Sequence, residues 1–222
     1  MINEFKWNIS KLWEGCILSS IAHSIMVAHY PELSNEHSWD RINYNIQNSE
    51  DTRGTITFTN NYCIAAFRYE KSPRINKNDF FYERYFKDAP IEILEFAKNE
   101  TLQYLLENYD SQVIPIITTA FWGYENRLNS NDTVEEFIEN GGFLIERELL
   151  ETRESMNRLI IYYDMTEKQV SLLKSLFEKK INNKDKKIYL SKDDIKLIGT
   201  DDYDGLTESR ISFEEIDVEW IE

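Results

Sequence analysis

The sequence predicts an α+β fold with a buried N-terminal helix, an antiparallel β meander, and then mixed helices and strands around a sheet. A long apolar segment near the N-terminus has a helical period, and three short segments of residues 41–69 have a strand period with short turns. Helical and strand-like segments alternate through the rest. Sequential hairpins favour this fold over a doubly wound parallel sheet, whose strands need long crossovers. The 222 residues predict a single domain, 1–222, with a weak subdivision near 125–131.

The N-terminal helix is the clearest predicted element. Ser10 can cap its start, because a serine hydroxyl accepts a hydrogen bond from an amide of the first turn, and Pro31 stops it. Apolar residues also occur away from the main stripe, which indicates a helix buried on most sides. The main stripe advances in steps of four residues: Trp13, Ile17, Ile21 and Ile25.

A β meander is predicted next. Residues 41–47 and 54–59 place apolar side chains at alternate positions, and residues 62–69 form a third strand. Asn60 and Asn61 stand between the second and third strands and fit a two-residue turn, because asparagine tolerates positive φ. Three short strands joined by short turns indicate an antiparallel sheet.

The middle of the chain is less regular. A helix is predicted from Pro90 to about Tyr109. A buried strand over Val113–Phe121 follows, and Pro115 within it indicates an edge or a bulge. The stretch before this helix has no clean period and is rich in aromatic residues: Phe80, Phe81, Tyr82, Tyr85 and Phe86.

The second half repeats the alternation of helices and strands. Asp132 is expected to cap a short helix over Thr133–Glu139, which Gly141 and Gly142 end. The other predicted elements are strands at Phe143–Leu149 and Arg158–Tyr163, a helix at Glu167–Ile181 capped by Thr166, a short helix from Ser191 through Ile198, and a weak strand at 211–221.

Charge is the strongest global signal. Forty acidic and 25 basic residues give a net charge of −15 and a pI of about 4.7. This field repels phosphate backbones, so we expect no nucleic-acid binding, and it attracts basic proteins. Residues 174–192 carry seven lysines and two acids (+5), whereas residues 201–222 carry nine acids and one arginine (−8). The two segments can pair with each other, or the acidic one can face a partner.

Motifs for catalysis, cofactors or metals are weak. The sequence contains no phosphate-binding glycine loop, no nucleophile elbow and no metal-ligand doublets, so we expect no cofactor and no metal. Cys16 and His23 lie two helical turns apart, too far for a hydrogen bond. His29 and His37 flank the Pro31 turn without a known metal spacing. An Asp-Gly loop near residue 204 lacks the first and last calcium ligands.

The function expected from these features is protein binding. We predict a non-enzymatic cytoplasmic protein, of the inhibitor or immunity type, that masks a basic partner such as a toxin. No transmembrane segment or secretion signal is visible, and two cysteines do not indicate disulfides. The alternatives are a small enzyme with a site around Cys16, His23, His29 and His37, or a subunit of a homo-oligomer. The expected partner-binding residues are Asp201, Asp202, Asp204, Glu208 and Trp220.

Overall fold

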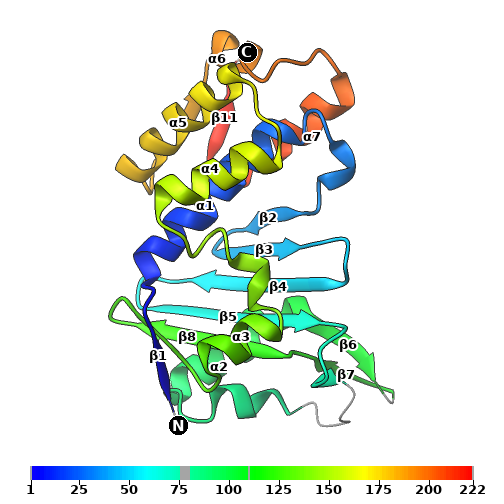
Figure 1. The fold of residues 1–222 in the computed structure, drawn as a ribbon, viewed down its shortest axis with the longest axis vertical. Coiled ribbons are helices and arrows are strands. Elements are labelled where there is room, and N and C mark those ends of the chain that lie inside the picture. Colours follow the sequence, from blue (N-terminus) through cyan, green and yellow to red (C-terminus); the bar gives the residue numbers. More distant parts are fainter. Residues whose placement is uncertain (1, 76–80, 110, 222) are drawn as a thin grey trace. The chain divides into compact units, whose positions relative to one another are not determined.

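The computed structural model describes residues 2–75, 81–109 and 111–221, and it confirms the α+β class. Figure 1 labels the elements along the chain. The chain forms two compact units, each built from separate stretches of sequence. The first unit contains Met1–Leu12 and Ile42–Glu146, and the second contains Trp13–Arg41 and Arg147–Glu222. Phe80 lies outside the described residues.

Six strands of the first unit are consecutive, antiparallel members of the main sheet, in the order β1-β9-β8-β5-β4-β3. The meander predicted from the sequence is confirmed by the pairing of β3 with β4 and of β4 with β5. The short first strand was not predicted. The bounds are β1 (Asn3–Phe5), β3 (Asn43–Gln47), β4 (Thr52–Phe58), β5 (Tyr62–Tyr69), β8 (Thr119–Tyr124) and β9 (Arg127–Ser130).

Two turns of this sheet differ from each other in their chemistry. The turn between β4 and β5 depends on Thr59, whose hydroxyl accepts hydrogen bonds from the amides of Asn61 and Tyr62. The positive φ angles occur instead at Glu125 (49°) and Asn126 (62°), which form the two-residue turn between β8 and β9. Both central residues of such a hairpin turn adopt this conformation.

The first unit also contains a two-stranded hairpin and short helices. The helix predicted to reach Tyr109 is wrong beyond Asn99, because the backbone leaves the helical region at Glu100. The strand predicted over Val113–Phe121 is two strands in two sheets, and Pro115 ends the first of them. The bounds are α2 (Ile91–Asn99), β6 (Leu106–Tyr109), β7 (Gln112–Pro115) and α3 (Val134–Glu139), with 3-10 helices η3 (Tyr82–Phe86), η4 (Thr101–Leu105) and η5 (Gly142–Ile145).

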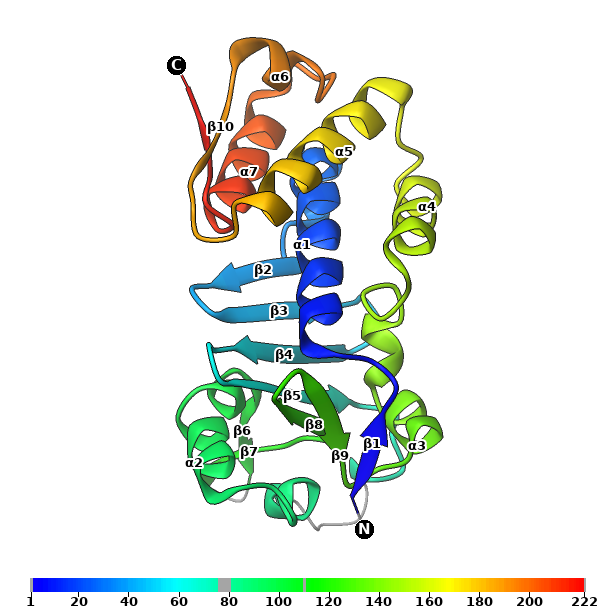
Figure 2. The same cartoon turned by 90° about the vertical axis from the view of Figure 1, so that its left-hand side faces the viewer.

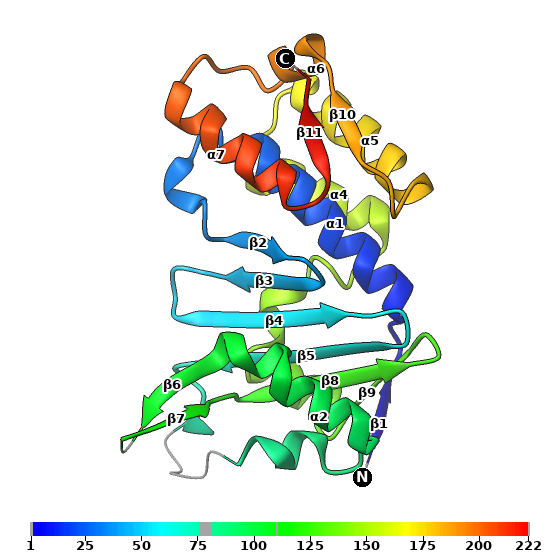
Figure 3. The same ribbon diagram turned by 180° about the vertical axis from the view of Figure 1, so that it is seen from behind.

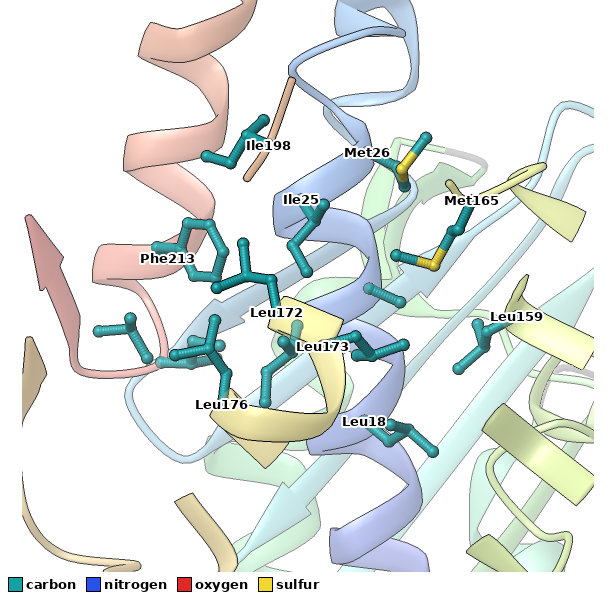
Figure 4. Close-up of a cluster of buried hydrophobic side chains, with 14 of the residues drawn as sticks. Leu18, Ile25, Met26, Leu159, Met165, Leu172, Leu173, Leu176, Ile198 and Phe213 are labelled. Atoms are coloured by element: carbon teal, nitrogen blue, oxygen red, sulfur yellow. The ribbon is translucent and has the colours of Figure 1, made fainter. Parts of the chain in front are cut away.

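The second unit surrounds the N-terminal helix α1 (Ile9–Met26). Burial of this helix on most sides is confirmed, since its residues contact side chains of α4, α5 and α7 in one core. Figure 2 shows α1 between α7 and α4. Figure 4 shows Leu18 and Ile25 of α1 among these side chains. The other elements are η1 (Pro31–Leu33), β2 (His37–Asp40), α4 (Thr152–Tyr162), α5 (Glu167–Asn182), β10 (Ile188–Leu190), α6 (Lys192–Lys196), α7 (Tyr203–Glu214) and β11 (Val218–Trp220).

Two predicted strands are wrong, and a third is right only near its end. Phe143–Leu149 contains η5 and a turn, and Arg158–Tyr163 belongs largely to α4. The segment 211–221 contains the end of α7, and only Val218–Trp220 is a strand. The run of β-branched and aromatic residues in α4 resembles a strand, but burial of Ser155 and Leu159, four residues apart, follows the helical period.

Two of the predicted helix caps are confirmed, and two others are replaced by nearby residues. Thr166 and Ser191 cap α5 and α6, each in a reciprocal capping box, as predicted. Thr133 rather than Asp132 caps α3, since the Asp132 carboxylate binds inward, 2.7 Å from the Arg74 guanidinium. The cap predicted for α1, Ser10, is also wrong. There the side chain of Asn8, not that of Ser10, accepts the hydrogen bond, from the amide of Lys11 at 2.9 Å.

Candidate functional site

The predicted acidic residues gather at the N-terminal end of α7. Asp201 and Asp202 precede the helix, Asp204 is in its first turn, and Glu208 lies one turn further on. The three aspartates are exposed and Glu208 is half-buried. Together with the intervening Tyr203 they form a surface that we call the acidic tip, consisting of Asp201, Asp202, Tyr203, Asp204 and Glu208.

Local chemistry explains why the chain forms a helix here. The Asp202 carboxylate accepts a hydrogen bond from the amide of Gly205 at 2.6 Å, and thereby caps α7. Acidic side chains in the first turn also interact favourably with the helix dipole. Two of the aspartates therefore have a structural role as well as a charge.

The start of α7 is held close against the end of α1. A Cβ atom on Gly205 would lie 2.1 Å from the carbonyl oxygen of Ala28, so only glycine fits at this distance. One turn later, the Ser209 hydroxyl donates to the carbonyl of Ser24 at 2.6 Å. Both contacts lie within the second unit and fix the acidic tip on a rigid support.

Ion pairing separates the acidic tip from the other acids of the C-terminal segment. Within the described residues, no ion pair reaches Asp201, Asp202, Asp204 or Glu208. The acids around β11, by contrast, bind the lysine-rich segment that precedes β10. Lys180 lies 3.4 Å from Asp217, and Lys187 also pairs with Glu219. Among the described residues, the basic and acidic segments therefore pair with each other at the β11 end and not at the acidic tip.

Tyr203 was not among the predicted partner-binding residues. It is the first residue of α7 and is 81% exposed, the highest exposure among the large hydrophobic side chains that the structure describes. In the sequence, Tyr203 follows Asp201 and Asp202 and precedes Asp204. A large aromatic residue between acids in a segment without a buried period was the signal that could have identified it.

Trp220 does not join the acidic tip. It lies in β11, beyond the other end of α7, a helix of 12 residues and hence about 18 Å long. Figure 3 shows β10 and β11 side by side near that end. The Trp220 side chain is half-buried against the helical core, and its indole nitrogen is buried without a hydrogen-bond partner among the described residues. Its packing supports the β10–β11 pair.

The residues of the alternative catalytic site are only partly brought together. The rings of His23 and His37 lie 5.2 Å apart between centroids. The His29 Nε2 atom lies elsewhere in the second unit, 2.8 Å from the carbonyl oxygen of Ile198. Cys16 is fully buried on α1.

A partly buried polar cluster lies beside His23 and His37. The Glu36 carboxylate accepts hydrogen bonds from the hydroxyls of Tyr162 at 2.7 Å and Tyr163 at 2.9 Å, and Arg147 lies 3.6 Å away. Burial and the bond to Glu36 raise the pKa of Tyr162 to about 12. The two tyrosine hydrogen bonds to Glu36 join the segment after η1 to the end of α4.

Searches for other kinds of site give no positive result. Among residues 2–75, 81–109 and 111–221, no group of three or more His, Cys, Asp or Glu side chains could hold a metal ion. No helix within these ranges has the length and hydrophobicity to cross a bilayer. Comparison of the chain with protein-family models, curated proteins and solved structures gave no match.

Proposed function

We propose that this protein is a non-enzymatic binding protein that captures and masks a basic protein, as an inhibitor or immunity protein masks a toxin. The observation that carries the proposal is the acidic tip, where four acids without ion pairs in the described part of the chain lie close in sequence to an exposed tyrosine. We place the encounter in the cytosol, since both cysteines are free and buried, as a reducing compartment favours.

The missing ion pairs matter because a bound lysine or arginine cancels much of a carboxylate's field. At physiological salt the Debye length is about 8 Å, so only charges that are close together act on one approaching partner. Four uncompensated acids within two turns of helix meet this condition. Such a cluster speeds capture of a basic partner and orients it.

Tyr203 supplies what charge alone does not. Exposed acids raise the rate of association, whereas slow release requires burial of apolar area. Tyrosine is enriched among residues that contribute most to protein interfaces, because its ring buries a large area while its hydroxyl stays hydrogen-bonded. In the proposed complex, the Tyr203 ring is the central contact and the acids form its charged rim.

Capture from the protein's own cells with matched variants tests this proposal. The tip variant carries Asp201→Asn, Asp202→Asn, Asp204→Asn and Glu208→Gln. The control variant carries the same number of changes at acids that are ion-paired: Glu154→Gln, Asp193→Asn, Glu214→Gln and Asp217→Asn. Both variants have a net charge of −15 + 4 = −11.

The proposal predicts one stoichiometric basic protein that the wild type and the control variant retain at low salt and the tip variant loses. Moderate salt should release this partner from all three baits. Equal retention by the tip and control variants would remove the acidic tip from the account. If none of the three baits retains a basic protein, the masking function itself is wrong.

A further inference from the structure

Two imidazoles are buried against each other inside the second unit. His23 of α1 is 1% exposed and His37 of β2 is 2% exposed. Their ring centroids are 5.2 Å apart, with the rings tilted by 58°. Neither ring nitrogen of His23 has a hydrogen-bond partner of ordinary geometry in the described part of the chain. The site of His23 therefore suits a neutral ring.

The nearest carboxylate offsets only part of an added positive charge. Glu36, the nearest carboxylate, lies 3.9 Å from His37 Nε2, but it is already bound by two tyrosine hydroxyls and faces Arg147. The Glu148 carboxylate accepts a 2.6 Å hydrogen bond from Ser19, one turn before His23. The titratable and charged groups gathered here are Glu36 after η1, Arg147 and Glu148 before α4, and Tyr162 and Tyr163 at its end.

Burial is the main reason why His23 and His37 are expected to resist protonation. It lowers the pKa of His23 to about 4, against opposing effects of Glu36 and of the Ser34 backbone. The pKa of His37 lies well below its usual value, because of burial first and then of His23 and Arg147. A proton on either ring would also repel a proton on the other.

We propose that the second unit contains an acid-triggered opening device, in which protonation of the adjacent rings of His23 and His37 separates β2 from α1. Trp39 follows His37 by two residues and reports the separation. Its indole donates to the Ser20 hydroxyl and its backbone amide to Glu215, each at 2.8 Å. Opening breaks both contacts and detaches β2 from α7 as well.

The direction of the pH effect follows from proton linkage. A histidine that is neutral when folded takes up a proton on unfolding, so stability is complete above pH 6.5 and falls as the pH drops toward 4. With a pKa of 6.5 in the unfolded chain and about 4 in the folded chain, His23 alone raises the unfolding constant ~30-fold between pH 7.5 and pH 5. Glu215 opposes this effect, because burial raises the pKa of its carboxyl.

Histidine NMR on the wild-type chain tests the device first. At least two of the three imidazoles should keep neutral-form shifts from pH 7.5 to pH 5 while the chain stays folded. If two or more titrate normally, near pH 6.5, the proposal is wrong. This measurement requires no variant and therefore does not depend on a substituted chain folding.

Urea unfolding at pH 7.5 and pH 5, followed by tryptophan fluorescence, is the second test. His23→Phe keeps a buried ring but removes the proton site, so it should lose ~30-fold of the wild-type rise in the unfolding constant. His29→Phe is the matched control and should keep the full rise, because the buried pair is intact. An unchanged pH dependence in His23→Phe would overturn the proposal.

Discussion

The two acidic ends of the C-terminal segment have similar composition and opposite surroundings. At the acidic tip, the carboxylates of Asp201 and Asp204 have no ion pair in the described chain. At β11, Asp217 and Glu219 pair with lysines that the chain supplies from the segment before β10. Acid density in a sequence therefore does not identify a binding surface. The pairing of strands decides which acids already form ion pairs with lysines of the same chain.

The β11 end owes its pairing to strand register. β10 and β11 run parallel, with Tyr189 opposite Glu219. This register places Lys187, which precedes β10, beside Glu219. No strand of the described chain brings a lysine to the start of α7 in this way. Changes at the two ends should thus produce different losses, stability at β11 and association at the acidic tip.

The largest expected effect on stability is that of Gly205→Ala. The new methyl would overlap the carbonyl oxygen of Ala28, so α7 must shift away from α1. We expect a loss of about 1–3 kcal/mol in the free energy of unfolding, measured with urea. Thr207→Ala, at an exposed site of the same helix, is the control and should stay within about 0.5 kcal/mol of the wild type.

A Gly205→Ala chain as stable as the wild type would show that α7 is not held tightly against α1. The acidic tip would then lack the rigid support that distinguishes it from a mobile charged segment.

A smaller effect should distinguish the paired acids from the unpaired ones. Asp217→Asn leaves the buried Lys180 ammonium without its carboxylate and should cost about 1 kcal/mol in urea unfolding. The positive φ of residue 217, 56°, suits asparagine, so backbone strain does not confuse the result. Asp201→Asn removes one charge without breaking an ion pair and should cost close to nothing. Equal losses in the two variants would remove the distinction.

Much of the local structure could be predicted from the sequence. The capping residues Thr166 and Ser191 act over three positions, so their signal is complete in the sequence. The meander was also predictable, because its strands are neighbours in the chain. The end of α4 was not, since Leu-Ile-Ile-Tyr-Tyr favours a strand and only the tertiary contacts of Leu159 select a helix.

The candidate site could be predicted only in part. The sequence shows the positions of the four acids of the acidic tip. It does not distinguish them from the acids around β11, which form ion pairs in the structure. Whether an acid forms an ion pair depends on contacts such as that between Lys180 and Asp217, which are 37 residues apart in the sequence. The exposure of Tyr203 also depends on tertiary structure, because a tyrosine beside acids can equally lie in a core.

We propose that unpaired acids at the acidic tip, rather than net charge, drive capture of a basic partner. The most direct test of this proposal is the association rate constant with the captured partner, measured by stopped flow at several salt concentrations for the wild type, the tip variant and the control variant. We predict a fall of about tenfold for the tip variant at low salt, with a flatter salt dependence, and near wild-type behaviour for the control. Identical rates and salt slopes for the two variants would contradict the account, because both have the same net charge.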